Sequence, residues 1–160
     1  MKKALILTLS MFMIVIQSLG QVNQPKYIAD ALKAYESGKY FEALPKLEAA
    51  YNKMTNKGKS ISEKGGMAYK VADCYRRMEQ FDKALQWYGS SIELRYYDVE
   101  PKVYYYHGEM LRMNGELAKA KDSYNNYKNK RGKDTSIDID AIISTCSEFN
   151  VVHEEESKYV

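Results

Sequence analysis

The feature that most constrains the fold of this 160-residue chain is a pattern that occurs three times. The segments ALKAYESGKYFEALPKLEAAY, ADCYRRMEQFDKALQWYGSSI and GEMLRMNGELAKAKDSYNNYK begin at residues 31, 72 and 108. Each opens on a small residue, and an alanine follows twelve residues later, at Ala43, Ala84 and Ala120. Apolar residues recur at three- and four-residue spacing throughout these segments, which is typical of α-helix. The pattern therefore predicts an all-α chain made of repeated helix pairs.

These anchors and the apolar positions between them resemble the tetratricopeptide repeat, whose period is about 34 residues. In that family, small residues at repeat positions 8 and 20 let the two helices of a pair approach closely, and position 8 here is Ala31, Ala72 and Gly108. Two packing positions also match, with Tyr40, Phe81 and Leu117 at position 17 and Leu47, Tyr88 and Tyr124 at position 24. The resemblance implies an all-α fold, an α-solenoid of about three helix-turn-helix repeats with a C-terminal capping helix.

The register of the repeats divides the chain into consecutive parts. One repeat domain is expected over residues 25–148, with repeats at about 25–56, 65–98 and 101–134 and a capping helix at about 136–148. The capping helix is indicated by DTSIDIDAIISTCSEF, whose acidic, hydroxyl-rich start precedes an apolar face that can close a solenoid. Extra residues between the first two repeats coincide with the polar segment TNKGKSISEKGG. We expect them to extend two helices and to join them by a longer loop.

Residues 1–20 have the layout of a secretory signal peptide. Two lysines precede an apolar run over residues 4–16, and cleavage is expected between Gly20 and Gln21. The alternative is an uncleaved membrane anchor, for which the run is short because a span needs about 20 residues. Residues 21–24 would then be a short linker, and residues 149–160 a tail or the start of a linker. The chain is therefore predicted to be exported, with no membrane span after cleavage.

The charge balance gives no support for nucleic-acid binding. The chain has 24 basic and 21 acidic residues, and removal of residues 1–20 takes away two lysines and no acids, which leaves a net charge of +1. A nucleic-acid binder would need a clustered basic surface. The two cysteines, Cys74 and Cys146, would meet an oxidising compartment that permits a bridge. Because they are far apart on helical patterns, two separate buried thiols are favoured over a disulfide.

Few residues could carry catalysis. The only histidines are His107, on a repeat helix, and His153, near the C-terminus. The sequence has no glycine-rich phosphate loop, no pair of histidines at metal-binding spacing and no nucleophile elbow. The carboxylates are scattered over helix surfaces, where paired, solvated side chains are the usual case. We therefore expect no enzyme, no catalytic residue, no cofactor, no metal and no small-molecule substrate.

A binding surface is the remaining candidate, and the repeat resemblance implies its location. In the family, positions 2, 5, 9, 12 and 13 of the first helices line a concave groove. The residues expected to bind a partner there are Tyr35, Tyr69, Asp73, Arg76, Arg77, Lys102, Tyr105, Glu109 and Arg112. Tyrosine and arginine often dominate the energy of protein interfaces, so a protein or peptide partner is predicted. In the alternative interpretation, the tyrosines fill gaps between helices and the arginines are merely solvated.

The same repeat register distinguishes the tyrosines of the run Tyr104-Tyr105-Tyr106. Tyr104, at position 4, is expected to pack inside its helix pair, and Tyr105 to face the groove, whereas Tyr106 receives no role. His107 is expected to be partly buried. One subset of the family grips a C-terminal carboxylate with lysine, asparagine and arginine at fixed groove positions, and only Lys102 would fit that pattern. A cytosolic chaperone adaptor is therefore disfavoured.

Longer sequence segments resemble a more specific group of proteins. CYRRMEQFDKALQWYGSSIEL, PKVYYYHGEMLRMNGELAKAKDSYNNY and ISTCSEF are similar to the N-terminal repeat region of Bacteroidetes envelope proteins that also carry a β-propeller and an OmpA-like domain. Some of these proteins are associated with type IX secretion and gliding. The resemblance implies a non-enzymatic periplasmic scaffold, free or associated with the outer membrane, and a truncated form of a longer protein. The alternative is a soluble periplasmic peptide carrier or holdase chaperone.

Overall fold

The computed structural model describes residues 25–58 and 60–146. The predicted signal peptide, the linker at 21–24 and the tail at 149–160 lie outside these residues. The described elements are the helices α2 (Lys26–Glu36), α3 (Tyr40–Lys53), α4 (Ser60–Arg77), α5 (Phe81–Glu93), the short 3-10 helix η1 (Tyr96–Asp98), α6 (Lys102–Met113) and α7 (Leu117–Lys130). Residues 139–146 are also helical. The described part of the chain contains no strand, so the all-α prediction is confirmed.

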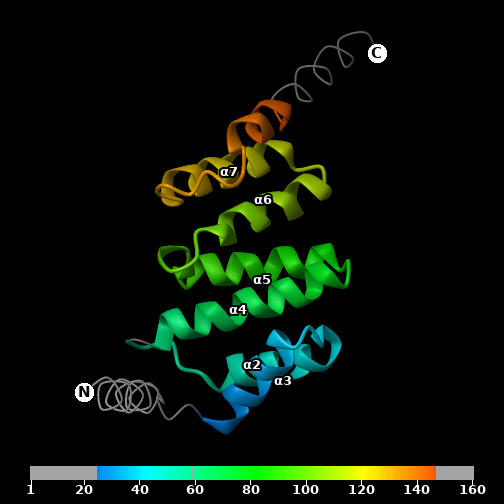
Figure 1. The fold of residues 1–160 in the computed structure, drawn as a ribbon, viewed down its shortest axis with the longest axis vertical. Helices are drawn as coiled ribbons and strands as arrows, with labels where there is room; N and C mark the ends of the chain where they lie inside the picture. The colour runs from blue at the N-terminus through cyan, green and yellow to red at the C-terminus, as the bar shows by residue number, and fades with distance from the viewer. Residues whose placement is uncertain (1–24, 59, 147–160) are drawn as a thin grey trace, which may run out of the picture.

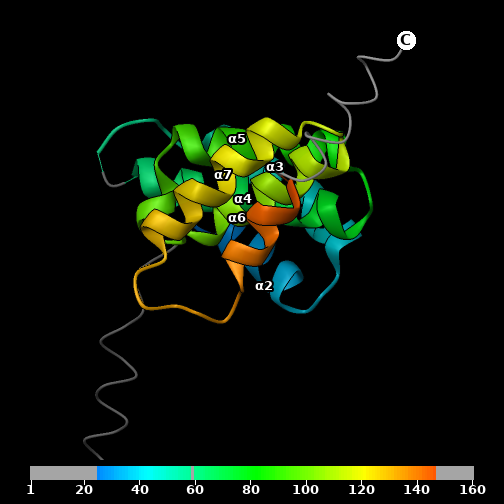
Figure 2. The same ribbon diagram turned by 90° about the horizontal axis from the view of Figure 1, so that it is seen from above.

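Consecutive helices form antiparallel pairs that stack in chain order. Figure 1 shows the pairs α2/α3, α4/α5 and α6/α7 following one another along the long axis, with helical residues 139–146 at the far end. Seen from above in Figure 2, the first helices α2, α4 and α6 lie toward one side of the stack, and α3 and α5 lie toward the other. Among the described helices, none combines the length and hydropathy that crossing a membrane requires.

Small residues let the two helices of each pair approach closely. Ala31, Ala43, Ala72, Ala84 and Ala120 are all buried without exposed surface. At the remaining anchor, a Cβ on Gly108 of α6 would lie only 2.7 Å from the Tyr124 ring of α7. The positions that the register assigned to helix packing are therefore the ones that form the core. The structure confirms an α-solenoid of tetratricopeptide-like repeats.

The turn inside each pair places one residue in the left-handed region of backbone conformation. These residues are Gly38 (φ 73°), Glu79 (φ 58°) and Gly115 (φ 77°). In the first turn the amide of Lys39 donates to the carbonyl of Ala34 at 3.1 Å, which closes the end of the helix. Glycine enters this region without strain, whereas Glu79 in the middle turn does so at some cost.

The inserted polar segment lengthens one helix instead of two. Helix α4 begins at Ser60 and has 18 residues, whereas α3 has 14 residues, the same length as α7. Two glycines of this segment, Gly65 and Gly66, lie in α4 where η1 packs on it. A Cβ at Gly65 would come within 2.9 Å of Tyr96 Cβ. The insertion therefore lengthens α4 and supplies the part of α4 against which η1 packs.

Helical residues 139–146 close the C-terminal end of the stack. Asp138 precedes them, and its carboxylate accepts the amide of Ala141 at 3.2 Å, which is a helix-capping contact. Ile139 and Cys146 are buried in one cluster with Tyr124 and Tyr127 of α7. The expected capping helix is thus present. Cys74 and Cys146 are both buried and free, as the sequence favoured.

Candidate functional site

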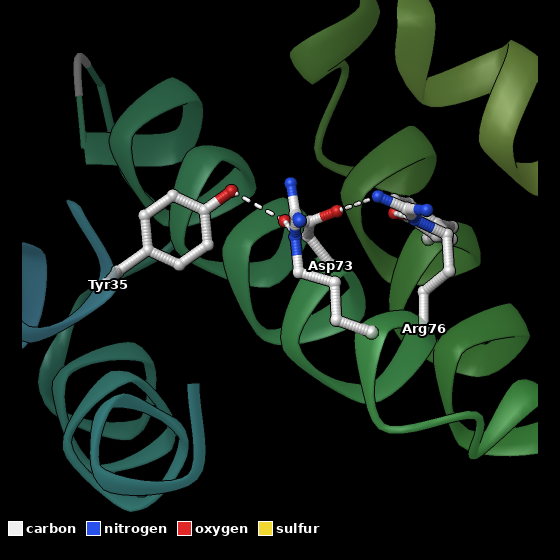
Figure 3. A network of polar contacts seen from close by, with 5 residues as sticks. Tyr35, Asp73 and Arg76 are labelled. Atoms are coloured by element: carbon white, nitrogen blue, oxygen red, sulfur yellow. Dashed lines mark hydrogen bonds and ion pairs between the residues drawn. The ribbon is translucent and has the colours of Figure 1, made fainter. Parts of the chain in front are cut away.

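Asp73 of α4 is the centre of a polar network on the side of the first helices. Its side chain is buried, with the residue 3% exposed. Tyr35 Oη of α2 donates to Asp73 Oδ2 at 2.8 Å, and Arg77 Nε donates to the same oxygen at 2.7 Å. Arg76 Nη2 donates to Asp73 Oδ1. Figure 3 shows Tyr35 and Arg76 reaching the carboxylate from opposite sides, so one acid links the first two repeats.

The electrostatics of this network hold Asp73 in its charged form. Burial alone would raise the pKa of the Asp73 carboxyl, but the hydrogen bonds from Arg77, Arg76 and Tyr35 outweigh it and lower that pKa below its usual value. Burial and the neighbouring Asp73 charge both raise the pKa of the Tyr35 hydroxyl. Tyr35 therefore remains a protonated donor at neutral pH.

Each arginine also lies against an aromatic ring. The guanidinium carbon of Arg76 lies 4.5 Å from the ring centroid of Tyr106, and that of Arg77 lies 4.6 Å from the ring centroid of Tyr40. Arg76 Nε donates to Tyr88 Oη at 3.2 Å. The Tyr88 and Tyr106 rings stack with centroids 5.8 Å apart. The salt bridges to Asp73 and the contacts with the Tyr106 and Tyr40 rings fix both guanidinium groups in place.

The third repeat, like the second, carries an acid, an arginine and a tyrosine at repeat positions 9, 12 and 24. Arg112 Nη2 donates to Glu109 Oε2 at 3.1 Å, and Tyr124 Oη donates to Glu109 Oε1 at 2.5 Å. Glu109, Arg112 and Tyr124 occupy positions 9, 12 and 24, which in the second repeat hold Asp73, Arg76 and Tyr88. In the first repeat, positions 9 and 24 are leucines. The acid, arginine and tyrosine therefore form a recurring unit of the second and third repeats.

The remaining residues predicted for the groove have other surroundings. The Tyr69 ring meets the rings of Tyr88 and Tyr96 at centroid distances of 5.7 Å, so it packs between helices. Tyr105 packs toward the C-terminal end, with its ring 5.7 Å from that of Tyr127. Lys102 Nζ lies 3.8 Å from Asp134 Oδ2 and makes no contact with the Asp73 network that the structure records. Side-chain hydrogen bonds thus join Tyr35, Asp73, Arg76 and Arg77 in one network, and Glu109 and Arg112 in another.

A cleft of about 400 Å³ lies between the second and third repeats, beside the arginines. Two of its lining residues, Arg76 and Arg77, belong to the Asp73 network. The complete lining is Arg76, Arg77, Glu79, Phe81, Tyr105, Tyr106, Glu109, Met110 and Met113. Met113 is 50% exposed, which is unusual for a large apolar side chain. A second hollow, of about 430 Å³, lies at the N-terminal end between α2 and α3, away from this network.

Sequence reasoning missed the contacts that Tyr106 and Tyr88 make with Arg76. Tyr106 follows the predicted Tyr105, but its position beneath Arg76 depends on how closely α4 and α6 approach, which repeat spacing does not give. Tyr88 was assigned to packing at position 24, and its hydroxyl also accepts a hydrogen bond from Arg76. The sequence did contain a signal for the role of Tyr88, because an acid, an arginine and a tyrosine recur at positions 9, 12 and 24 of the second and third repeats.

This face offers hydrogen-bond donors, charged groups and aromatic rings. His107 lies outside the cleft lining, with Nδ1 2.8 Å from Ser123 Oγ, and burial lowers its pKa. His107 is partly buried, as the sequence predicted, and its burial favours the neutral form of the imidazole. Within residues 25–58 and 60–146, no group of three or more histidine, cysteine or acidic side chains could hold a metal ion.

Comparison with solved structures identifies proteins of similar fold. The structure of the Yersinia enterocolitica type III secretion chaperone SycD in complex with a peptide of the translocator YopD matches with a TM-score of 0.60 and 19% identity, over 81% of this chain and 92% of that chain. A structure of SycD described as the translocator chaperone matches with a TM-score of 0.58 and 17% identity, over 88% of this chain and 93% of that chain. A scan against protein-family models and a search of curated proteins found no match. At these identities the likeness is one of fold.

Proposed function

We propose that this chain is a non-enzymatic repeat module that binds a protein or peptide partner through the face of its first helices. The observation that carries the proposal is the cleft between the second and third repeats. It is lined by arginines that salt bridges fix in place, by tyrosine rings and by an exposed methionine. Side chains that are already fixed lose little entropy on binding, and tyrosine and arginine contribute strongly at interfaces. The nine residues predicted for the groove are proposed as its partner-binding set. Four of them line the cleft, namely Arg76, Arg77, Tyr105 and Glu109.

The matched variants Met113→Asp and Phe41→Asp test which face binds. Met113 lies in the cleft, whereas Phe41, 85% exposed, lies on α3, a second helix. A charge at Met113 should abolish capture of the partner from cell-envelope extracts, because it would be buried against an apolar surface. The same change at Phe41 should leave capture intact, as judged by quantitative pull-down. The opposite result would place the interface on the second helices.

The location that we propose is the bacterial envelope. The signal-peptide layout of residues 1–20 and the narrower sequence resemblance support a periplasmic scaffold, free or associated with the outer membrane, in a type IX secretion, gliding or OmpA-like assembly. Cell fractionation combined with N-terminal sequencing tests this proposal. A mature protein that begins at Gln21 in the periplasmic fraction is expected. A cytoplasmic protein that retains residues 1–20 would contradict it.

A periplasmic peptide carrier or holdase chaperone is the second candidate. It is favoured by the fold neighbours, which are chaperones, one of them solved with a bound peptide. A holdase should bind many unrelated unfolded segments weakly and suppress their aggregation, whereas a scaffold should form one stable complex. Light scattering of a heated substrate protein, with and without this chain, separates the two. Suppression that the Met113→Asp variant loses would favour the carrier.

A further inference from the structure

The charges of the cleft indicate which kind of peptide it takes. We infer that the cleft binds a partner segment in which an acidic side chain stands next to a large apolar one, and that Arg76 and Arg77 receive the acid. The inference rests on the function proposed above and adds the chemistry of the partner. It depends on three observations, which concern the surplus of positive charge, the unused donors of the arginines and the apolar surface beside them.

The Asp73 network leaves positive charge at the cleft wall. One carboxylate bonds to two guanidinium groups, so the three side chains together carry one surplus positive charge. The negative charge is buried, because the Asp73 side chain is 4% exposed, whereas the Arg77 side chain is 44% exposed. An approaching partner therefore meets the cations and not the acid that holds them. Charge complementarity predicts an anionic group beside the two guanidinium groups, and the exposed Glu79 of the same lining acts against it.

The two arginines also retain hydrogen-bond donors. A guanidinium group has five N–H donors in a planar fork. Arg77 donates to Asp73 through Nε, and Arg76 donates through Nε and Nη2 to Tyr88 and Asp73. Among the described residues, the structure records no acceptor for either terminal nitrogen of Arg77 or for Nη1 of Arg76. A carboxylate can receive two parallel hydrogen bonds from such a group.

The remainder of the cleft is suited to an apolar neighbour. Apolar surface in its lining comes from Met113, Phe81 and the Tyr106 ring. Of the two acids in the lining, Glu109 already accepts bonds from Arg112 and Tyr124, and its side chain is 18% exposed. Glu79 is exposed, and no cation among the described residues forms an ion pair with it. Glu79 should therefore repel an acidic ligand, so that its removal should have the opposite effect on binding to the removal of an arginine.

This site differs from the carboxylate grip that the sequence already disfavoured. Arg76 and Arg77 occupy repeat positions 12 and 13, whereas only Lys102 fits the pattern of that grip, and Lys102 lies beside Asp134. The acid that we infer belongs to a side chain within a segment. Peptides with blocked ends therefore suffice to detect it.

The test uses N-acetylated, C-amidated peptides in which glutamate is flanked by leucine and phenylalanine, and the same peptides with glutamine in place of glutamate. Fluorescence anisotropy with the purified protein measures the dissociation constants. We expect the glutamate peptides to bind at least about tenfold more tightly, which corresponds to one charge-assisted contact. The preference should decline as salt is added, because part of it is electrostatic.

Three variants assign the preference to this cleft. Arg77→Gln should bring the glutamate and glutamine peptides to nearly equal affinity, whereas Glu79→Gln should increase the preference for glutamate. Arg95→Gln is the matched control, because the Arg95 side chain is 71% exposed and lies outside the cleft, beside Asp98. It should leave both affinities unchanged. Circular dichroism of each variant confirms that it is folded.

The outcomes separate this inference from the proposed function. Equal binding of both peptide types by the unaltered protein would overturn the inference and leave peptide binding in place. Absence of binding for all peptides, together with intact partner capture by Met113→Asp, would overturn both. A preference that survives Arg77→Gln would remove the arginines from the site. If glutamate peptides bound only after glutamates 154–156 were changed to glutamine, the occupant would be the chain's own C-terminal segment, which would overturn a separate partner.

Discussion

At the scale of single residues, Asp73 has the most consequences for this molecule. It is a buried acid whose hydrogen-bond partners come from two helices, α2 and α4. Removal of a buried partner leaves the other groups without their acceptor, which costs more than the net value of the contact. The same carboxylate positions the arginines of the cleft. Stability and recognition therefore depend on one side chain.

The variant Asp73→Asn is expected to lower the free energy of unfolding by roughly 2 kcal/mol at pH 7, because Asn cannot accept from both arginines as a carboxylate does. The folded-state pKa of Asp73 is lowered, so its contribution is present above the unfolded pKa of about 3.9 and is lost as pH falls through the folded pKa. The difference between the two proteins should therefore shrink below about pH 4. Urea unfolding across that range measures it.

The exposed Asp30 of α2 provides the control for this prediction. Asp30→Asn removes one carboxylate from the surface of the first repeat without touching the Asp73 network. Its effect on the free energy of unfolding should stay within about 0.5 kcal/mol at pH 7. Equal losses for the two variants would show that overall charge, and not the buried network, accounts for the effect of Asp73.

At the scale of helices, the close approach of α6 to α7 depends on glycine at position 108, which has no side chain. A Cβ at Gly108 would lie within 2.8 Å of two atoms of the Tyr124 ring. Tyr124 is fully buried and its hydroxyl is bonded to Glu109, so the ring has little room to move. Any added methyl group must push the helices apart.

We expect Gly108→Ala to lower the free energy of unfolding by about 1 to 3 kcal/mol, the usual cost of overpacking. Gly89 of α5 is the matched control, because an added Cβ there would meet nothing within 4 Å. Gly89→Ala should stabilise the protein by up to about 1 kcal/mol, since alanine restricts the unfolded chain and favours helix. Thermal or urea unfolding measures both. Destabilisation by Gly89→Ala would contradict the packing argument.

At the scale of the whole molecule, the main contacts between the described repeats join neighbouring repeats, as expected of a solenoid. Between the first and second repeats, the Tyr51 ring of α3 meets the Trp87 ring of α5 edge to face, with centroids 4.9 Å apart. Trp87 is the single tryptophan of the sequence. Its fluorescence therefore reports on this junction, whereas circular dichroism reports on all helices.

Tyr51→Ala should weaken this junction by about 2 kcal/mol and separate the two signals. In urea, fluorescence should change at lower denaturant than circular dichroism, because the first repeat detaches before the others unfold. Tyr97→Ala removes a ring stacked on Tyr104 at 5.1 Å, in the second and third repeats, and should not bring the fluorescence change forward. Coincident transitions in both variants would show that the described repeats unfold as one unit.

The sequence by itself determined the helix pairs, their anchors and the closing helix. These features depend on residue spacing within a segment of about 34 residues, and the register placed Ala31, Ala84 and Gly108 in the contact between paired helices. Spacing is enough for them because both helices of a pair are close in the chain.

Only the tertiary structure decided how one repeat meets the next. The Tyr35 to Asp73 hydrogen bond, the position of Arg76 over Tyr106 and the contact of the Tyr51 and Trp87 rings all join different repeats. Each depends on the rotation and distance between successive pairs, which are set by the side chains that fill the space between them. A repeat register states which face a residue occupies within its own pair. It does not state what lies opposite, and for that reason the cleft emerged only from the folded chain.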